Sequence, residues 1–371
     1  KDGYEWEDRF LVRMRTIGKI LMEQSVGKVP KSRNQKKKLH TCVGELEVNK
    51  RHPLAQLKSS FNVSKKLQEL MCMAGQSQVF KDGEALFLKM MGITVSGMQI
   101  QRVSENYGEH IEADHHRFIE GEKTPSSIAD KKKDTMYVMV DGSMLFTREE
   151  GWKEIKVGRL FAQKDCVPVQ EERNEIVKSQ YVCHLGDHHE FLNKFECYVE
   201  DYKKKVCIAD GAKWIWNWAE DTYPEMIQIL DYYHAVEKLS LYIAEQIPDA
   251  ERRKKWLEKQ KKLLLNNNAA IVLADLRQQQ GRTEAAEKQR KAVISYYQNN
   301  LKRMQYKTFI EAGYMIGSGP MESAHRNIVQ QRLKLSGQKW SIKGAQRIVN
   351  LRAYQKSNRW DEVVEIIKIA A

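Results

Sequence analysis

The stretches YVMVDG (137–142) and VCIADG (206–211) each carry an apolar run into the dipeptide Asp-Gly. Short apolar runs that end in a turn signal are typical of strands buried in a sheet. Each strand would end in a carboxylate, Asp141 or Asp210, at the edge where open α/β sheets place their binding sites. An ordinary strand-ending turn also explains either Asp-Gly taken singly, so the pair needs support from the rest of the chain.

The sequence around these two stretches predicts a mixed sheet. Short β runs are expected at residues 135–140, 154–161, 181–185, 206–209 and 226–230. Helical segments fall between the third and fourth runs and between the fourth and fifth. Three consecutive strands followed by alternating helix and strand predict an α/β fold, a five-stranded mixed sheet with helices on its faces.

A third acidic residue follows much later in the chain. The segment GSGPMESAHR (317–326) predicts a flexible turn, then Pro320 at the start of a helix and Glu322 in its first turn. His325 and Arg326 come one turn later on roughly the same face. A glutamate that complements the dipole of a surface helix would give the same local pattern.

The two carboxylates on adjacent strands, Asp141 and Asp210, would lie close together and repel each other. Hard divalent cations suit a site made only of oxygen ligands, so we expect Mg²⁺ or Mn²⁺ to bind there.

In this order, Asp141, Asp210 and Glu322 resemble the DDE triad of the RNase H-like transposases and integrases. The surrounding chain is similar to the Kra-type transposases of bacterial insertion sequences over roughly residues 135–355, and more loosely over 62–110. The matching segments are DGSM (141–144), GWKEIKVG (151–158), YVCHLGD (181–187), DGAKWIWN (210–217), ILDYYHAVEKL (229–239) and residues 317–340.

The resemblance implies an RNase H-like sheet with a large all-α insertion. It also implies two Mg²⁺ ions, replaceable by Mn²⁺, held by Asp141, Asp210 and Glu322. The implied activity is cleavage of DNA at the ends of a mobile element and transfer of the 3′-OH into target DNA. Two metals can clamp the attacking and leaving oxygens of such a displacement.

Asp231 and His234 match the Asp-x-x-His motif that the related mutator-like transposases carry after the second acid. We expect Asp231 to support the site without binding metal, since three ligands suffice. His234 either orients or protonates the scissile phosphate or has a structural role at the helix start, and His325 is a further supporting residue.

A basic, amide-rich segment follows Glu322, and no acid occurs from residue 323 to 349. Such a segment suits phosphate contacts, although a solvated helix face would look similar. The predicted DNA contacts are Arg326, Arg332, Lys334, Lys339, Trp340, Lys343 and Arg347, together with Trp214. Trp214, Trp216 and Trp218 could stack on an unpaired base, but we expect at least two of them in the core.

The composition agrees with an anionic partner. The 371 residues include 62 Lys and Arg against 49 Asp and Glu, a net charge of +13. Double-stranded DNA is the expected partner, while surface lysines kept for solubility would give the same charge. No stretch is apolar enough to span a membrane and no signal peptide opens the sequence, which favours a cytoplasmic, nucleoid-associated protein.

The six cysteines are scattered, and none forms a CxxC pair. They are expected to be reduced thiols. Relatives often carry an N-terminal cysteine pair, but Cys42 is the one cysteine in the first 60 residues, so a zinc site there is doubtful.

Three regions are expected. Residues 1–60 form a basic, least regular region, whose run 27–38 suggests a solvated arm or linker. Residues 61–133 form a helical DNA-binding region, either helix-turn-helix-like, with a capping box at Ser96 and Gln99, or an ordinary helical bundle. Residues 134–371 form the catalytic domain, with a helical insertion at about 233–314.

The sequence thus predicts a DNA transposase that works as a homo-oligomer, a dimer or larger, because two element ends must be brought together. Two alternatives stay open. One is an RNase H-like nuclease without strand transfer, and the other is a DNA-binding regulator derived from a transposase.

Overall fold

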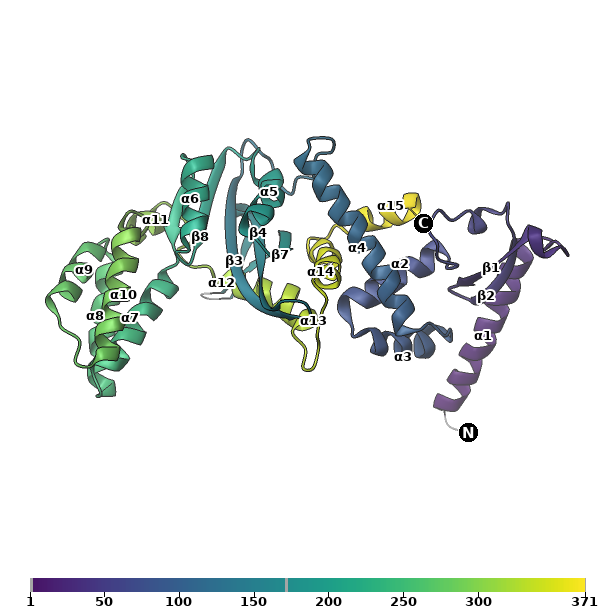
Figure 1. The fold of residues 1–371 in the computed structure, drawn as a ribbon, viewed down its shortest axis with the longest axis horizontal. Coiled ribbons are helices and arrows are strands. Elements are labelled where there is room, and N and C mark those ends of the chain that lie inside the picture. The colour runs from purple at the N-terminus through teal and green to yellow at the C-terminus, as the bar shows by residue number, and fades with distance from the viewer. Residues whose placement is uncertain (1–2, 171–172, 371) are drawn as a thin grey trace.

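The computed structural model describes residues 3–170 and 173–370. The molecule is elongated, with a helical bundle at one end, a β-sheet in the middle, and the N-terminal helix and a hairpin at the other end (Figure 1). Within the described ranges, no helix has both the length and the apolarity needed to cross a lipid bilayer.

The central sheet contains the five predicted strands. They are β3 (Thr135–Thr147), β4 (Gly151–Ala162), β7 (Gln180–Leu185), β8 (Lys204–Ala209) and β9 (Ile227–Leu230). Their order is β7-β4-β3-β8-β9; β4 is antiparallel to both neighbours, and β3, β8 and β9 are parallel. The predicted α/β class with a mixed sheet is therefore confirmed.

A second small hairpin, β5 (Cys166–Gln170) with β6 (Arg173–Ile176), was not predicted. Pro168 lies inside β5, and a proline within a short run argues against a strand when only the sequence is considered.

Helices cover both faces of the sheet. They include α5 (His188–Val199), α6 (Lys213–Thr222), α12 (Gly319–Ala324) and α13 (Gln331–Leu333). A Cβ at Gly158 of β4 would lie 2.4 Å from the Phe195 ring of α5, while the next residue, Arg159, donates to Pro320 O of α12. Since successive strand residues point to opposite faces, α5 and α12 lie on opposite faces of the sheet.

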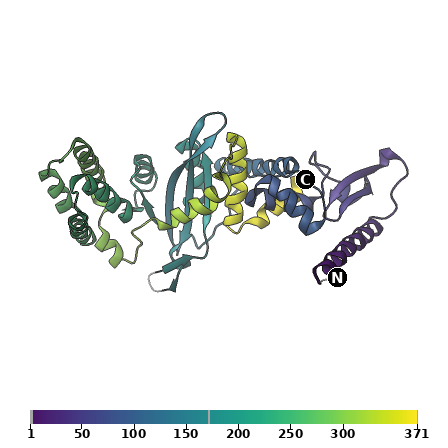
Figure 2. The same ribbon diagram turned by 90° about the horizontal axis from the view of Figure 1, so that it is seen from below.

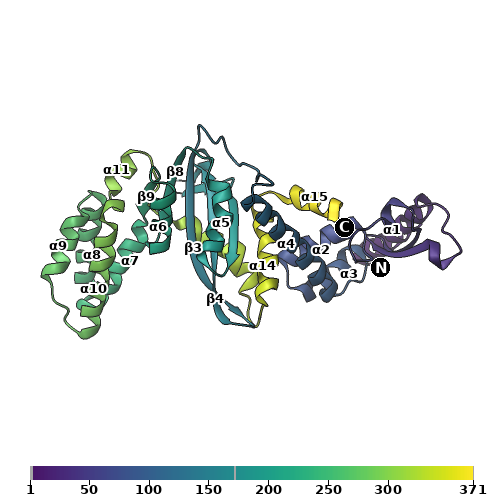
Figure 3. The same ribbon diagram turned by 45° about the horizontal axis from the view of Figure 1, so that its top comes forward.

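The insertion is entirely helical where it was predicted to be, at about 233–314. Its helices are α7 (Tyr232–Gln246), α8 (Ala250–Leu265), α9 (Ala269–Gln278), α10 (Glu284–Asn300) and α11 (Tyr306–Glu311). Asp249 and Thr283 cap α8 and α10, and each accepts a backbone N–H of its helix, at 2.7 and 3.1 Å. Figure 3 shows the bundle gathered at the end of the molecule away from the N-terminus.

The expectation that residues 1–60 are least regular is wrong. They form α1 (Gly3–Ser25) and the hairpin of β1 (Lys36–Thr41) and β2 (Gly44–Asn49). The last part of the basic run lies in β1, where Lys36 and Lys38 form ion pairs with Glu47 and Glu45 of β2. Cross-strand pairing of opposite charges stabilises a hairpin here, although the same lysines read in isolation suggested an arm.

The predicted helical region contains α2 (Lys65–Ser77), α3 (Phe80–Met91) and α4 (Gly97–Ile119). Ser96 Oγ accepts from Gln99 N at 3.2 Å, so the predicted cap is present. A helix-turn-helix role stays a prediction.

Two C-terminal helices, α14 (Ile342–Lys356) and α15 (Trp360–Ala370), pack against α2 and α4. Helix α14 contributes Leu351 and Tyr354 to the core of the helical region, and Ile348 and Val349 to the core around the sheet. Helix α14 lies between the sheet and the helical region, as Figure 1 and Figure 2 show. Residue 133 therefore does not separate two independent cores.

Candidate active site

Asp141 and Asp210 lie at neighbouring positions on adjacent parallel strands. The pairing of β3 with β8 runs to Met139 opposite Ile208, and two further residues bring Asp141 beside Asp210. Neighbouring strands are about 4.8 Å apart. Burial raises the pKa of the Asp210 carboxyl, and the charge of Asp141 raises it further. The two carboxylates are close enough to repel each other. Asp210 follows the end of its strand, as expected, but the expectation that the first strand ends before Asp141 is wrong: β3 runs on to Thr147, because its hairpin partner β4 continues to pair with it.

Asp141 contacts the helix that carries Glu322. Its Oδ1 accepts from Gly142 N at 2.7 Å, and its Oδ2 lies 3.2 Å from His325 Nε2. The His325 ring is buried, and neither of its nitrogens has a well-aligned hydrogen-bond partner. The predicted supporting residue His325 is thus directly beside the first acid.

The turn after Asp210 is fixed by the helical insertion. Tyr296 Oη of α10 donates to Asp210 O at 2.6 Å. Gly211 has φ +100°, and a Cβ there would lie 2.6 Å from the Tyr296 ring. Only glycine combines that backbone conformation with so close an approach. Sequence reasoning missed Tyr296, because nothing local links it to Asp210.

Glu322 occupies the first turn of α12, as predicted, and is exposed. Arg159 of β4 donates to Pro320 O at 2.7 Å and to Ser323 Oγ at 3.0 Å, which fixes the start of this helix. Within the described part of the chain, the Glu322 carboxylate makes no hydrogen bond or ion pair. It lies one helical turn before His325, and its approach to the two aspartates stays a prediction.

Asp231 is 1% exposed, and both of its oxygens are engaged. Oδ1 accepts from Tyr233 N and His234 N at 2.6 and 3.0 Å, capping α7, while Oδ2 accepts from Ser318 N at 2.7 Å and from Ser318 Oγ. Burial would raise the pKa of Asp231, but hydrogen bonds from His234 and Ser318 outweigh burial and lower it. Asp231 therefore ties the end of β9 to the loop that starts α12, as expected of a supporting residue.

His234 is half-buried, and its Nδ1 lies 3.2 Å from Asp231 Oδ2. Its contact with Asp231 raises the pKa of His234 to about 8, and the charges of Asp210 and Asp141 add to this effect. At neutral pH the imidazole is therefore mostly protonated and sits in the field of the two predicted metal ligands.

The predicted DNA contacts differ in exposure. Arg326, Lys334, Lys339 and Lys343 are exposed, and Arg347 is half-buried in an ion pair with Glu109. Arg332 and Trp340 are buried. Trp216 and Trp218 also lie in the core, whereas Trp214 is half-buried against His188 and Phe191.

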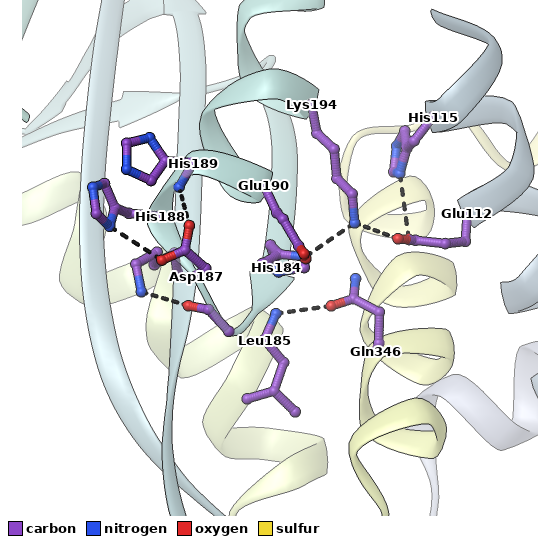
Figure 4. A network of polar contacts seen from close by, with 12 residues as sticks. Glu112, His115, His184, Leu185, Asp187, His188, His189, Glu190, Lys194 and Gln346 are labelled. Carbon is purple, nitrogen blue, oxygen red and sulfur yellow. Dashed lines mark hydrogen bonds and ion pairs between the residues drawn. The ribbon is translucent and has the colours of Figure 1, made fainter. Parts of the chain in front are cut away.

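Figure 4 shows a second charged region, which the sequence did not suggest. Lys194 of α5 contacts Glu112 of α4, and its Nζ lies 3.0 Å from His184 Nδ1 of β7. Burial, followed by the charge of Lys194, lowers the pKa of His184 to about 3. This network joins the helical region to the sheet.

Beside this network, Asp187, His188 and His189 place one ligand atom each within 4.8 Å of one another. Asp187 is the N-cap of α5 and accepts from His189 N at 2.7 Å, which accounts for its position. Imidazoles suit transition metals and give no support to a magnesium site.

No protein-family model matches this chain, and a search of curated proteins finds no relative.

Proposed function

We propose that the chain is a DDE-type DNA transposase of the Kra-type insertion-sequence group, related to mutator-like transposases, with an RNase H-like core. The proposal is supported by a mixed five-stranded sheet in which Asp141, inside β3, lies beside Asp210, directly after the end of β8. A long helical insertion separates the second acid from Glu322, as the resemblance implies.

The neighbouring carboxylates of Asp141 and Asp210 are the observation that carries the proposal. Within the described residues, no lysine or arginine forms an ion pair with either of them. Two acids that form no ion pair with a lysine or arginine are the oxygen donor set that Mg²⁺ or Mn²⁺ prefers, and Glu322 would complete it. When bound, two such ions would stabilise the attacking and leaving oxygens of a phosphoryl displacement.

The chain's own residues orient this site. Asp231 and Arg159 hold the loop and the first turn that carry Glu322, which fixes the backbone from which this side chain would approach the aspartates. His234 turns Nδ1 toward Asp231, which leaves Nε2 to donate a proton to a phosphate oxygen. The exposed Arg326, Lys334 and Lys343 would contact the DNA backbone nearby.

The test is cleavage and joining of DNA by the full chain with Mg²⁺, using duplexes taken from the DNA that flanks its gene. We expect nicked and strand-joined products with the wild-type chain. Asp210→Asn and Asp141→Asn should lower both by about 10³-fold or more, while the exposed control Asp221→Asn stays at the wild-type level.

Other outcomes decide between the alternatives. Cleavage without joining would favour the nuclease, and binding without cleavage would favour the regulator. Undiminished cleavage by Asp210→Asn would show that the assigned metal site is wrong.

A further inference from the structure

A pocket of about 270 Å³ lies where the sheet domain meets the helical region. Its walls come from the tip of the β3–β4 hairpin, the loop after α13, and helices α3 and α4. Arg148 N donates to Trp340 O at 2.8 Å, and Arg148 Nε donates to Lys339 O at 3.0 Å, so hairpin and loop are held together.

Arg332, which lines this pocket, is 0% exposed. Its Nε donates to Gly75 O at 2.9 Å, but Nη1 and Nη2 have no hydrogen-bond partner. Within the described residues no carboxylate forms an ion pair with it, and burial together with nearby Arg352 lowers its pKa to about 10, so it stays charged at neutral pH. A buried charge without a partner is strongly destabilising unless something else compensates it.

The surroundings of the guanidinium determine which partner fits. Its carbon lies 4.6 Å from the Phe80 ring centre and 4.8 Å from that of Trp340. Both rings therefore already pack on Arg332, and no base can stack between them and the guanidinium. The unpartnered N–H groups are left for an oxyanion, which such a fork binds in bidentate fashion.

Two further cations and one acid also line the pocket. Arg148 and Lys339 are exposed beside the buried guanidinium. The acid in the lining, Glu105, already accepts from Gln101 Nε2 at 2.7 Å. Gln338 Oε1 is buried without a partner, and its amide can turn to present the NH₂ group instead.

We propose that this pocket binds a phosphate group through the Nη1 and Nη2 edge of Arg332, with Arg148 and Lys339 at the rim. That the phosphate belongs to the DNA backbone rests on the proposed function. Arg332 follows Glu322 on one helical stretch, interrupted by a π-helical segment, His325–Gln330. At 1.5 Å per residue the two are about 15 Å apart along the helix, the axial length of about four base pairs.

The experiment measures binding of inorganic phosphate and of a short blunt DNA duplex to the full chain, by calorimetry at constant ionic strength without metal. Arg332→Lys keeps the charge and removes the fork, and we expect it to weaken both affinities about tenfold. Because Arg332 is buried, Arg148→Ala provides a second variant on an exposed residue, with an expected loss of threefold to tenfold. Arg282→Ala, an exposed arginine of the insertion, is the matched control and should bind like wild type.

Each result has a defined meaning. Parallel losses for phosphate and duplex support a backbone phosphate in the pocket. A loss of affinity for inorganic phosphate alone supports the pocket and shows that the phosphate group it binds does not come from DNA. Wild-type affinity of both Arg148→Ala and a folded Arg332→Lys for both ligands would overturn the pocket itself. The assay contains no metal, so these results hold even if the chain proves unable to cut DNA.

Discussion

Two charged regions of this molecule differ in how their charges are balanced. In the network of Figure 4, Lys194 lies between Glu112 and His184, and Asn350 Nδ2 donates to Glu112 Oε2 at 2.8 Å. Where the parallel pairing of β3 and β8 ends, by contrast, two carboxylates lie side by side.

The difference separates charges that hold the fold from charges left for a ligand. A satisfied network rigidifies the contact between elements, and removing one partner leaves the other buried and unpaired. An uncompensated acid pair weakens the fold and remains available for a cation, which is how active sites commonly trade stability for function. Mutations in the two regions should therefore have opposite effects.

The largest effect on stability is expected for Lys194→Met. Lys194 is 3% exposed, and its loss leaves the half-buried Glu112 without its lysine partner. We expect the free energy of unfolding, measured in urea, to fall by about 3–5 kcal/mol. Lys203→Met, on an exposed lysine, should change it by less than about 0.5 kcal/mol. A loss for Lys194→Met as small as that of the control would contradict a structural role of the network.

Asp231→Asn should affect both stability and activity, because Asp231 joins the cap of α7 to the loop before α12. Loss of a charged acceptor for Ser318 and weakening of the cap should lower the free energy of unfolding by about 2–3 kcal/mol. DNA cleavage should fall about 10- to 100-fold, as for residues that orient metal ligands. Denaturation and cleavage are measured on the same preparation, and cleavage equal to wild type would mean that the loop does not position Glu322.

Acid should destabilise the protein through His184. Its pKa is about 3 in the folded state, so below pH 6.5 the unfolded chain binds a proton that the folded chain does not. The contribution of neutral His184 to the free energy of unfolding is fully present above pH 6.5. It decreases as the pH falls, and at pH 5 it is smaller by about 2 kcal/mol. Exposed Glu190, 3.0 Å from His184 Nε2, is screened by solvent and does not reverse this effect.

The lowered pKa of Glu112 adds a further loss at lower pH. Urea denaturation from pH 8 to pH 5 measures the slope. His184→Gln should flatten it between pH 6.5 and 5, and an unchanged slope in that variant would assign the effect to other groups.

The smallest effect on stability is expected for Asp210→Asn. Removing a carboxylate that burial and Asp141 disfavour should leave the melting temperature in EDTA unchanged or slightly higher. In Mg²⁺ the wild-type chain should gain stability by mass action and the variant should not. Equal stabilisation of both proteins by Mg²⁺ would place the ion elsewhere.

Local patterns were enough to predict much of this structure. The five strands follow from apolar runs, Ser96 caps the helix that its spacing indicated, and the insertion is helical where its composition predicted helices. These features depend on residues a few positions apart.

Contacts between distant segments could not be predicted in this way. Three contacts join residues that are far apart in the sequence. They are the hydrogen bond from Tyr296 to Asp210, the bonds from Arg159 to the start of α12, and the packing of Arg332 against the Phe80 and Trp340 rings. The basic run that ends in β1 was misread for the same reason, because its neutralising glutamates lie on the partner strand.

Helix α14 has a consequence for synthesis of the protein. It completes the core of the helical region with Leu351 and Tyr354, yet it is made long after the helices that it covers. Helices α2 and α4 emerge from the ribosome some 250 residues earlier, and until α14 arrives they expose the apolar surface that it covers. A chain released before α14 would leave both the helical region and the sheet without this cover, so α14 is a condition for folding of both.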